Sequence, residues 1–196
     1  MCNDYEQHIV WAEYCDLMQS LRLGVSARQN ERDLPRADDI RVNDLAPVMR
    51  ATGEKIELSQ MNFGWPPKGR GGPVFNLRSE GRRFADSKRC LIPATAFFEF
   101  TGKKYPKAKH RFSLKGAPFM AIAGIWHEGE GNHPPAFAML TTAPGPDVEP
   151  YHDRQVAVLP PESWAAWIYM TKSEAELLHP LSEGSLEVET VRKRSD

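Results

Sequence analysis

Short apolar runs that follow one another closely along the chain limit its possible folds more than any other feature. Gly, Pro and charged turns separate these runs, which cover 89–92, 96–101, 110–114, 118–126, 136–142 and 155–159. Because no segment of helix length lies between them, βαβ units are not indicated and antiparallel strand pairing is. Residues 54–63 and 186–192 also alternate between apolar and polar positions, which predicts two more strands.

A few helices are expected beside these strands. The segment 6–23 predicts a helix because its apolar residues recur at helical spacing, and 25–46 predicts a long polar loop. Pro160-Pro161-Glu162 is typical of a helix start, and Thr171-x-x-Glu174 resembles a capping box for a second short helix. We therefore expect an α+β fold in a single domain over 1–196.

Composition excludes several classes of protein. Apolar residues at 41% and charged residues at 26% fit a soluble globular domain of 196 residues. No apolar run approaches the roughly 18 residues that span a membrane, and the polar N-terminus is not a secretory signal. Cys2, Cys15 and Cys90 are odd in number and lack CxxC spacing. We expect a cytoplasmic protein without disulfides or a cysteine zinc site.

The net charge of −1 conceals a basic middle between acidic flanks. Residues 68–115 hold thirteen Lys or Arg and three Asp or Glu, interleaved with Phe75, Phe84 and Phe112. This pattern is typical of a face that binds single-stranded nucleic acid. The alternative is a solvated lysine-rich loop at 103–111, and charge alone does not decide between the two.

Cys2 directly follows Met1, and removal of Met1 would give it a free α-amine next to its thiol. Such a 1,2-aminothiol condenses with an aldehyde to an imine, and the thiol then closes a five-membered thiazolidine ring. Both groups titrate near neutrality, at about 8 and about 8.5, so each is partly nucleophilic. The alternative is that a cysteine stands at this position by accident.

Other residues that can carry chemistry are scattered along the chain. Glu99 lies in an apolar strand, where burial would raise its pKa and suit it to proton transfer, although alternation with Phe98 and Phe100 could instead point it to solvent. His152 precedes a strand and can act as a general acid or base, or be a surface histidine. Asn76 and Arg78 supply donors suited to a phosphate. We expect no metal site at His127, Glu128, Glu130 and His133, which lack HExxH spacing.

The ordered set of motifs resembles the SOS response-associated peptidase family, the abasic site processing proteins. The resemblance runs nearly end to end. Its pieces are Met1-Cys2, Asp44-Leu45-Ala46-Pro47, Asn76-Leu77-Arg78-Ser79-Glu80, Arg89-Cys90-Leu91-Ile92-Pro93-Ala94 with Phe98-Glu99-Phe100, Phe119 to Trp126, Leu140-Thr141-Thr142-Ala143, and Tyr151-His152-Asp153-Arg154. The fold that it implies is a single α+β domain on a curved, largely antiparallel, barrel-like sheet with a few flanking helices.

The resemblance implies a function and a role for each matched residue. Family members expose an N-terminal cysteine by removing methionine, bind single-stranded DNA, and form a covalent thiazolidine with the aldehyde of an abasic site. By position, Cys2 is the nucleophile, Asn76 holds the N-terminus and the sugar, Glu99 moves protons, and His152 assists ring opening and reversal of the link. The DNA contacts fall to Arg78 and Arg154 at phosphates, and to Phe63 and Trp65 at bases.

The implied protein is an enzyme that removes its own Met1 and has crosslinking and lyase activity. It needs no cofactor or metal, works as a monomer away from membranes, and associates with the nucleoid when bound to damaged DNA. The chain departs from the family at Asn3-Asp4, where Gly-Arg is usual, and at Phe63-Gly64, where Trp-Gly is usual. Two other functions stay open: a cysteine amidohydrolase or peptidase with an N-terminal nucleophile, and a non-catalytic module that binds single-stranded DNA.

Overall fold

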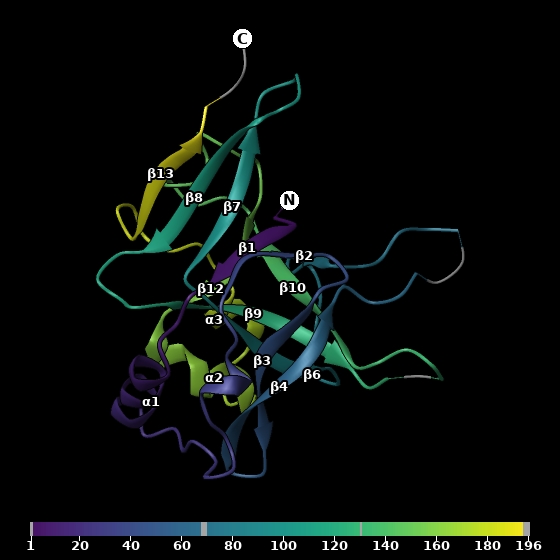
Figure 1. Cartoon of the computed structure of the whole chain (residues 1–196), viewed down its shortest axis with the longest axis vertical. Helices are drawn as coiled ribbons and strands as arrows, with labels where there is room; N and C mark the ends of the chain where they lie inside the picture. The colour runs from purple at the N-terminus through teal and green to yellow at the C-terminus, as the bar shows by residue number, and fades with distance from the viewer. Residues whose placement is uncertain (1, 68–69, 130, 194–196) are drawn as a thin grey trace.

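Two β-sheets and a group of short helices make up the fold (Figure 1). The structure is a computed structural model that describes residues 2–67, 70–129 and 131–193. Its strands are β1 Asp4–Gln7, β2 Ala37–Arg41, β3 Leu45–Thr52, β4 Lys55–Phe63, β5 Asn76–Arg78, β6 Lys88–Ala94, β7 Ala96–Thr101, β8 Ala108–Leu114, β9 Met120–His127, β10 Ala136–Thr142, β11 Gln155–Val156, β12 Val158–Leu159 and β13 Leu186–Arg192. Its α-helices are α1 Trp11–Ser20, α2 Trp164–Ile168 and α3 Glu174–Leu177, and its 3₁₀ helices are η1 Glu31–Asp33 and η2 Pro161–Ser163.

The first sheet has the strand order β13-β8-β7-β1-β2, and all of its pairings are antiparallel. The strand β1 lies between β7 and β2, with Tyr5 opposite Phe97 on one side and Asp4 opposite Arg41 on the other. On the far side of β7, Glu99 is the register partner of His110 in β8. This sheet therefore brings the N-terminal residues next to the strand that carries Glu99.

The second sheet has the order β11-β10-β4-β3-β6-β9-β12, and β5 pairs with β10. Most pairings are antiparallel, but β10 runs parallel to both β4 and β5. The strand β9 pairs with β6 and also with β10, so the sheet curls back toward itself. Met49 and Leu91 are the register partners that join β3 to β6. The sheet is curled and barrel-like without forming a closed barrel, which confirms the predicted fold class.

The core has two layers, one on each face of the second sheet. One layer fills the space between the two sheets and includes Cys2, Tyr5, Phe63, Phe97 and Phe137. The other packs the second sheet against the helices, which gather on one side of the molecule (Figure 1). Two apolar layers explain why β9 and β10 are apolar almost throughout: they are buried on both faces.

Several predicted elements are confirmed. The strands expected at 54–63 and 186–192 are β4 and β13, and each of the apolar runs from 89 to 159 contains a strand. The helix expected after Pro160 begins with η2 and continues as α2. No helix among the described residues is both long enough and apolar enough to cross a membrane.

Three local predictions were wrong. The helix expected over 6–23 is α1 over Trp11–Ser20, because the residues before it are drawn into the first sheet as β1. The loop expected over 25–46 contains η1 and β2, since β2 pairs with β1. The capping box before α3 consists of Ser173 and Glu176, because the helix starts two residues later than the Thr171 motif indicated.

Candidate active site

Cys2 lies buried between the two sheets, with 1% of its surface exposed. Its Sγ donates a hydrogen bond to the carbonyl oxygen of Asp4 at 3.2 Å. The side-chain amide of Asn76 donates to the carbonyl oxygen of Cys2 at 2.6 Å, so β5 holds the start of the chain. Burial, together with the negative charge of Glu99, raises the pKa of the Cys2 thiol to about 12. The thiol is therefore neutral at physiological pH. Met1, whose removal the sequence analysis predicts, lies outside the described residues.

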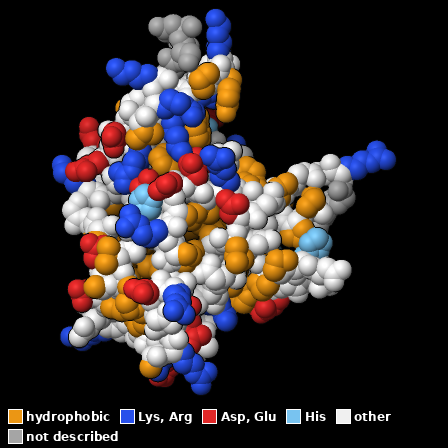
Figure 2. All heavy atoms as spheres, in the orientation of Figure 1, with side chains coloured by type: hydrophobic (Ala, Val, Ile, Leu, Met, Phe, Trp, Pro, Cys, Tyr) orange, Lys and Arg blue, Asp and Glu red, His pale blue; other side chains and the backbone are white. Residues whose placement is uncertain are grey.

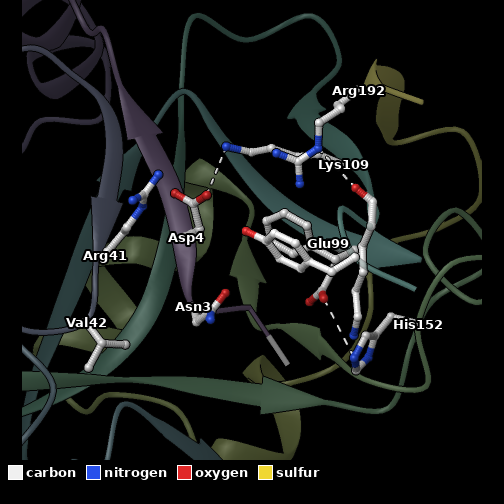
Figure 3. A pocket seen from close by; sticks show the side chains of 11 residues that line it. Asn3, Asp4, Arg41, Val42, Glu99, Lys109, His152 and Arg192 are labelled. Carbon is white, nitrogen blue, oxygen red and sulfur yellow. Dashed lines mark hydrogen bonds and ion pairs between the residues drawn. The ribbon is translucent and has the colours of Figure 1, made fainter. Parts of the chain in front are cut away.

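Glu99 is also buried, so strand alternation does not turn it to solvent. Burial, reinforced by the charge of Asp153, raises the pKa of its carboxyl group to about 7. The carboxylate oxygen Oε2 lies 3.7 Å from Nε2 of His152 (Figure 3). Burial lowers the pKa of His152 below its usual 6.5, although Asp153 opposes this shift. Glu99 can therefore gain or lose a proton near neutral pH, and burial favours the neutral form of His152.

The loop that carries His152 also sets where its proton lies. The backbone N–H of Arg154 donates to Nδ1 of His152 at 3.0 Å, so in the neutral imidazole this nitrogen is an acceptor. The proton of the neutral ring is then on Nε2, the nitrogen that faces Glu99. When the ring is protonated, Nδ1 carries a proton toward the Asp153 carboxylate, whose Oδ1 lies 2.9 Å away. The loop thus supports both protonation states.

An open pocket with a volume of about 550 Å³ gives solvent access to this pair. Figure 3 shows Glu99 and His152 on one side of it, Asp4 and Arg41 on the other, and Asn3 between them. The residues that line it are Asn3, Asp4, Arg41, Val42, Glu99, Phe100, Tyr105, Lys107, Lys109, His152 and Arg192. The chain next to Cys2 therefore borders the same pocket as the two proton-carrying groups.

Arg78 and Arg154, the two predicted phosphate contacts, differ in their surroundings. Arg78 is exposed on β5, and because alternate strand residues face the same way, it shares a side with Asn76. Arg154 is buried and bonds to both carboxylate oxygens of Glu80 at 2.6 and 2.8 Å, and to the carbonyl oxygen of Thr141 at 2.8 Å. These bonds tie β5, β10 and the His152 loop together, which argues against a phosphate contact for Arg154.

Phe63 and Trp65, the two predicted base contacts, also differ. Phe63 is fully buried and stacks on Phe137 with ring centroids 5.1 Å apart. A ring without exposed surface cannot stack on a base, so its burial argues against the predicted DNA contact. Trp65 is half-buried, and its ring packs edge-on against His127 at 4.2 Å. Its exposed part leaves a stacking role open.

The basic middle segment is neutralised in part within the fold. Four of its cations form ion pairs, namely Lys88 with Glu128, Arg89 with Glu174, Lys109 with Asp4 and Asp39, and Arg111 with Glu6. Basic and acidic side chains accordingly mix over the face drawn in Figure 2 instead of separating. Phe84 and Phe112 are buried. The charge count therefore does not by itself define a DNA-binding face, and binding of single-stranded DNA by this segment stays a prediction.

No group of three or more His, Cys, Asp or Glu residues suited to a metal ion occurs in the part of the chain that the structure describes. Glu130, one member of the set considered above, lies outside that part. Sequence reasoning missed the other half of the pocket, where Asp4, Lys109 and Arg41 meet. The charge run at 103–111 was a signal for it, but the spacing did not show that Lys109 faces the N-terminal strand.

Comparisons with known proteins identify the family. The family model for the SOS response associated peptidase (SRAP) matches residues 1–195. The abasic site processing protein YoqW of Bacillus subtilis is 34% identical over 146 residues, which cover 66% of this chain and 65% of the relative. The abasic site processing protein YobE of the same species is 32% identical, with 66% of each chain covered. The match thus spans just under two thirds of these relatives' length.

Solved structures share the fold. A protein from Bordetella bronchiseptica superposes with a TM-score of 0.74 at 20% identity, covering 97% of this chain and all of that one. A protein from Bacteroides thetaiotaomicron gives a TM-score of 0.74 at 18% identity, covering 97% and 92%. With the fold, the site and a family model over nearly the whole length in agreement, the chain belongs to the SOS response associated peptidase family, whose curated relatives are named abasic site processing proteins.

Proposed function

We propose that this chain binds single-stranded DNA at an abasic site and that Cys2, after removal of Met1, forms a covalent thiazolidine with the aldehyde of that site. The observation that carries the proposal is the proximity of four groups, two of which, Glu99 and His152, line one pocket. Cys2 is held by Asn76, its pKa responds to the charge of Glu99, and Glu99 lies beside His152. Residues 1–196 act as one domain in this proposal, and as a monomer.

The reaction needs a free amine on Cys2. While Met1 is attached, the nitrogen of Cys2 is an amide whose lone pair is delocalised, so it does not attack an aldehyde. Hydrolysis of the bond between Met1 and Cys2 consumes one water and releases the amine. Glu99, with a pKa of about 7, can take a proton from the attacking water. This step is the peptidase activity of the proposal.

Crosslinking then proceeds by condensation. The amine adds to the aldehyde carbon, and one water leaves to give the imine. The thiol adds to the imine carbon and closes the five-membered ring, so one water is released in total and nothing is oxidised or reduced. Glu99 in its acid form protonates the departing hydroxyl, and its carboxylate then accepts the thiol proton, which a pKa of about 7 permits in both directions.

His152 assists two other steps, the opening of the abasic sugar before crosslinking and the reversal of the link after it. An abasic deoxyribose is mostly a closed ring, and opening it moves a proton from the C1′ hydroxyl to the ring oxygen. A neutral imidazole with its proton on Nε2 can carry out such a transfer, with Glu99 as its neighbour. The same pair supports reversal of the link, in which the imine takes up one water and is hydrolysed. The lyase part of the proposal is instead an elimination from that imine, in which loss of a C2′ proton expels the 3′ phosphate.

A denaturing gel tests the proposal. Wild-type protein is mixed with a single-stranded oligonucleotide that contains one natural abasic site, and with the same strand carrying a tetrahydrofuran analogue that has no aldehyde. We expect a band that survives denaturant and heat with the natural site, and none with the analogue or with Cys2→Ala. Cleavage of a peptide amide supplied in a parallel reaction, without a crosslink to DNA, would favour the amidohydrolase alternative. Binding of DNA without either reaction would favour the non-catalytic module.

A further inference from the structure

The side of the pocket opposite Glu99 and His152 is built around the carboxylate of Asp4, which is 5% exposed (Figure 3). Its Oδ2 pairs with Nζ of Lys109 at 2.9 Å. Its Oδ1 is buried and receives no hydrogen bond from a described residue, although the carboxyl group of Asp39 lies against the same side chain. A buried carboxylate oxygen without a donor is costly to maintain, so Oδ1 is suited to accept a hydrogen bond from a bound molecule.

Donors flank this acceptor. Figure 3 shows Asp4 between Arg41 and Lys109, and both of these cations line the pocket. Asp39 neutralises them from outside the pocket, with its carboxylate 2.6 Å from Lys109 and 3.2 Å from Arg41. This side of the pocket therefore presents one acceptor next to fixed donors, and the charges of Asp4, Asp39, Arg41 and Lys109 balance there. This pattern suits hydrogen bonds to the polar edge of a nucleobase better than binding of a phosphate.

Aromatic surface lies at the same pocket. Tyr105, in the loop between β7 and β8, is 88% exposed, and Phe100 lines the pocket beside it. Arg192 anchors this loop by donating from Nε to the carbonyl oxygen of Lys107 at 3.0 Å. Exposed aromatic rings stack on unpaired bases of any sequence. A volume of about 550 Å³ is in the range of small-molecule sites.

We propose that the pocket holds the nucleobase next to the abasic site, and that Asp4 reads the amino group of that base. Adenine and cytosine present an amino group beside a ring-nitrogen acceptor, which matches Oδ1 of Asp4 next to the donors of Lys109 or Arg41. Thymine presents a carbonyl oxygen where the amino group would be, so it meets the carboxylate with repulsion. The preference for adenine or cytosine over thymine rests on the proposed function, because it presumes that the abasic sugar lies at Glu99 and His152.

Equilibrium binding tests this preference without any chemistry. Fluorescence anisotropy at fixed salt measures the affinity for single strands that carry a tetrahydrofuran abasic analogue, with adenine, cytosine or thymine on either side of it. For wild-type protein we expect about tenfold tighter binding with adenine or cytosine than with thymine on one of the two sides, the ratio expected for one hydrogen bond to a charged acceptor. Because this arm uses the unaltered chain, it does not depend on how a variant folds.

Variants identify the residue that causes the preference for adenine or cytosine. Asp4→Asn keeps the shape but presents an amide that can donate or accept, so we expect the preference to fall below about twofold. Asp86→Asn removes the charge of an exposed carboxylate that does not line the pocket, so it should keep the preference. Tyr105→Ala should weaken binding to all three strands equally, because stacking does not depend on base identity.

Equal affinity for all neighbours in the wild type, or a full preference in Asp4→Asn, would overturn the inference, as would failure to bind any strand. The analogue has no aldehyde, so the outcome does not depend on crosslinking. If the preference is present but natural abasic sites are never crosslinked, the proposed function fails while the base-reading pocket stands.

Discussion

Nε2 of His152 and Oε2 of Glu99 lie 3.7 Å apart, and burial raises the pKa of Glu99 while it lowers that of His152. The pKa of Glu99 rises to about 7, and that of His152 falls below its usual 6.5. Glu99 is then a usable acid and a usable base near pH 7, beside an imidazole that is neutral at that pH. The pair, with Cys2 beside it, is the centre of the mechanism proposed for this chain.

Glu99→Gln keeps the shape of the side chain but removes its proton transfer. We expect crosslinking to natural abasic sites to slow by roughly 10²-fold, typical of losing a general acid–base group. The wild-type rate should bend near pH 7, where Glu99 titrates, and the variant should lose that bend. Single-turnover rates between pH 5 and 9 provide the measurement. A variant with the wild-type rate and profile would remove Glu99 from the mechanism.

The same substitution should stabilise the fold, because a buried carboxylate is costly. The pKa of Glu99 is about 7 in the folded chain against a usual 4.5, so the folded state holds more protons than the unfolded state between these values. Wild-type stability therefore falls as pH rises through this window. Relative to wild type, Glu99→Gln should gain up to about 3 kcal/mol at pH 8 and little at pH 4. Urea unfolding at both pH values checks this, and a gain that does not depend on pH would contradict it.

His152→Ala should affect ring opening more than ring closure of the thiazolidine. We expect the rate with an abasic oligonucleotide to fall further than the rate with a small aldehyde, which is already open. His179→Ala, an exposed histidine outside the pocket, is the matched control and should leave both rates unchanged. Equal losses on the two substrates would assign His152 to a step after ring opening.

Arg78 and Arg154 should separate into a DNA contact and a structural contact. Arg78→Ala should weaken binding to single-stranded DNA and reduce its salt slope by about 0.7, the value for one phosphate. Lys55→Ala, an exposed cation at the β3–β4 turn, is its control. Arg154→Ala should instead lower the free energy of unfolding by about 2 kcal/mol, since Glu80 and Thr141 lose their buried partner. A salt slope that Arg154→Ala changes as much as Arg78→Ala does would contradict this division.

The strands β4 and β6 to β13 were predictable from sequence because they fall in short apolar runs or alternating segments between turns, and this local signal survives in the fold. The position of β1 was not, because Asp4–Gln7 becomes a strand only through its partners β2 and β7, which lie far along the chain. The parallel pairing of β10 with β4 and β5 is likewise non-local. Pairings between distant strands do not change the pattern of apolar and polar residues within either strand, so the sequence of one strand does not predict them.

The identities of the main site residues were predictable from sequence, but most of their contacts were not. The motifs placed Cys2, Asn76, Glu99 and His152 in one family pattern, and the structure brings all of them to one region. They did not show that Arg154 is satisfied by Glu80, that Phe63 is a core ring, or that Lys109 reaches Asp4. A count of cations cannot tell paired from unpaired charges, because pairing depends on which strands become neighbours.

The most direct test of the central claim is the intact mass of the product formed with an abasic oligonucleotide. We predict a mass equal to the chain beginning at Cys2 plus the oligonucleotide minus one water, formed without added reductant and stable to denaturant and heat. Cys2→Ala should give no such species while its affinity for single-stranded DNA stays nearly unchanged. A product of equal yield that retains Met1, or one that forms on Cys2→Ala, would contradict the aminothiol mechanism.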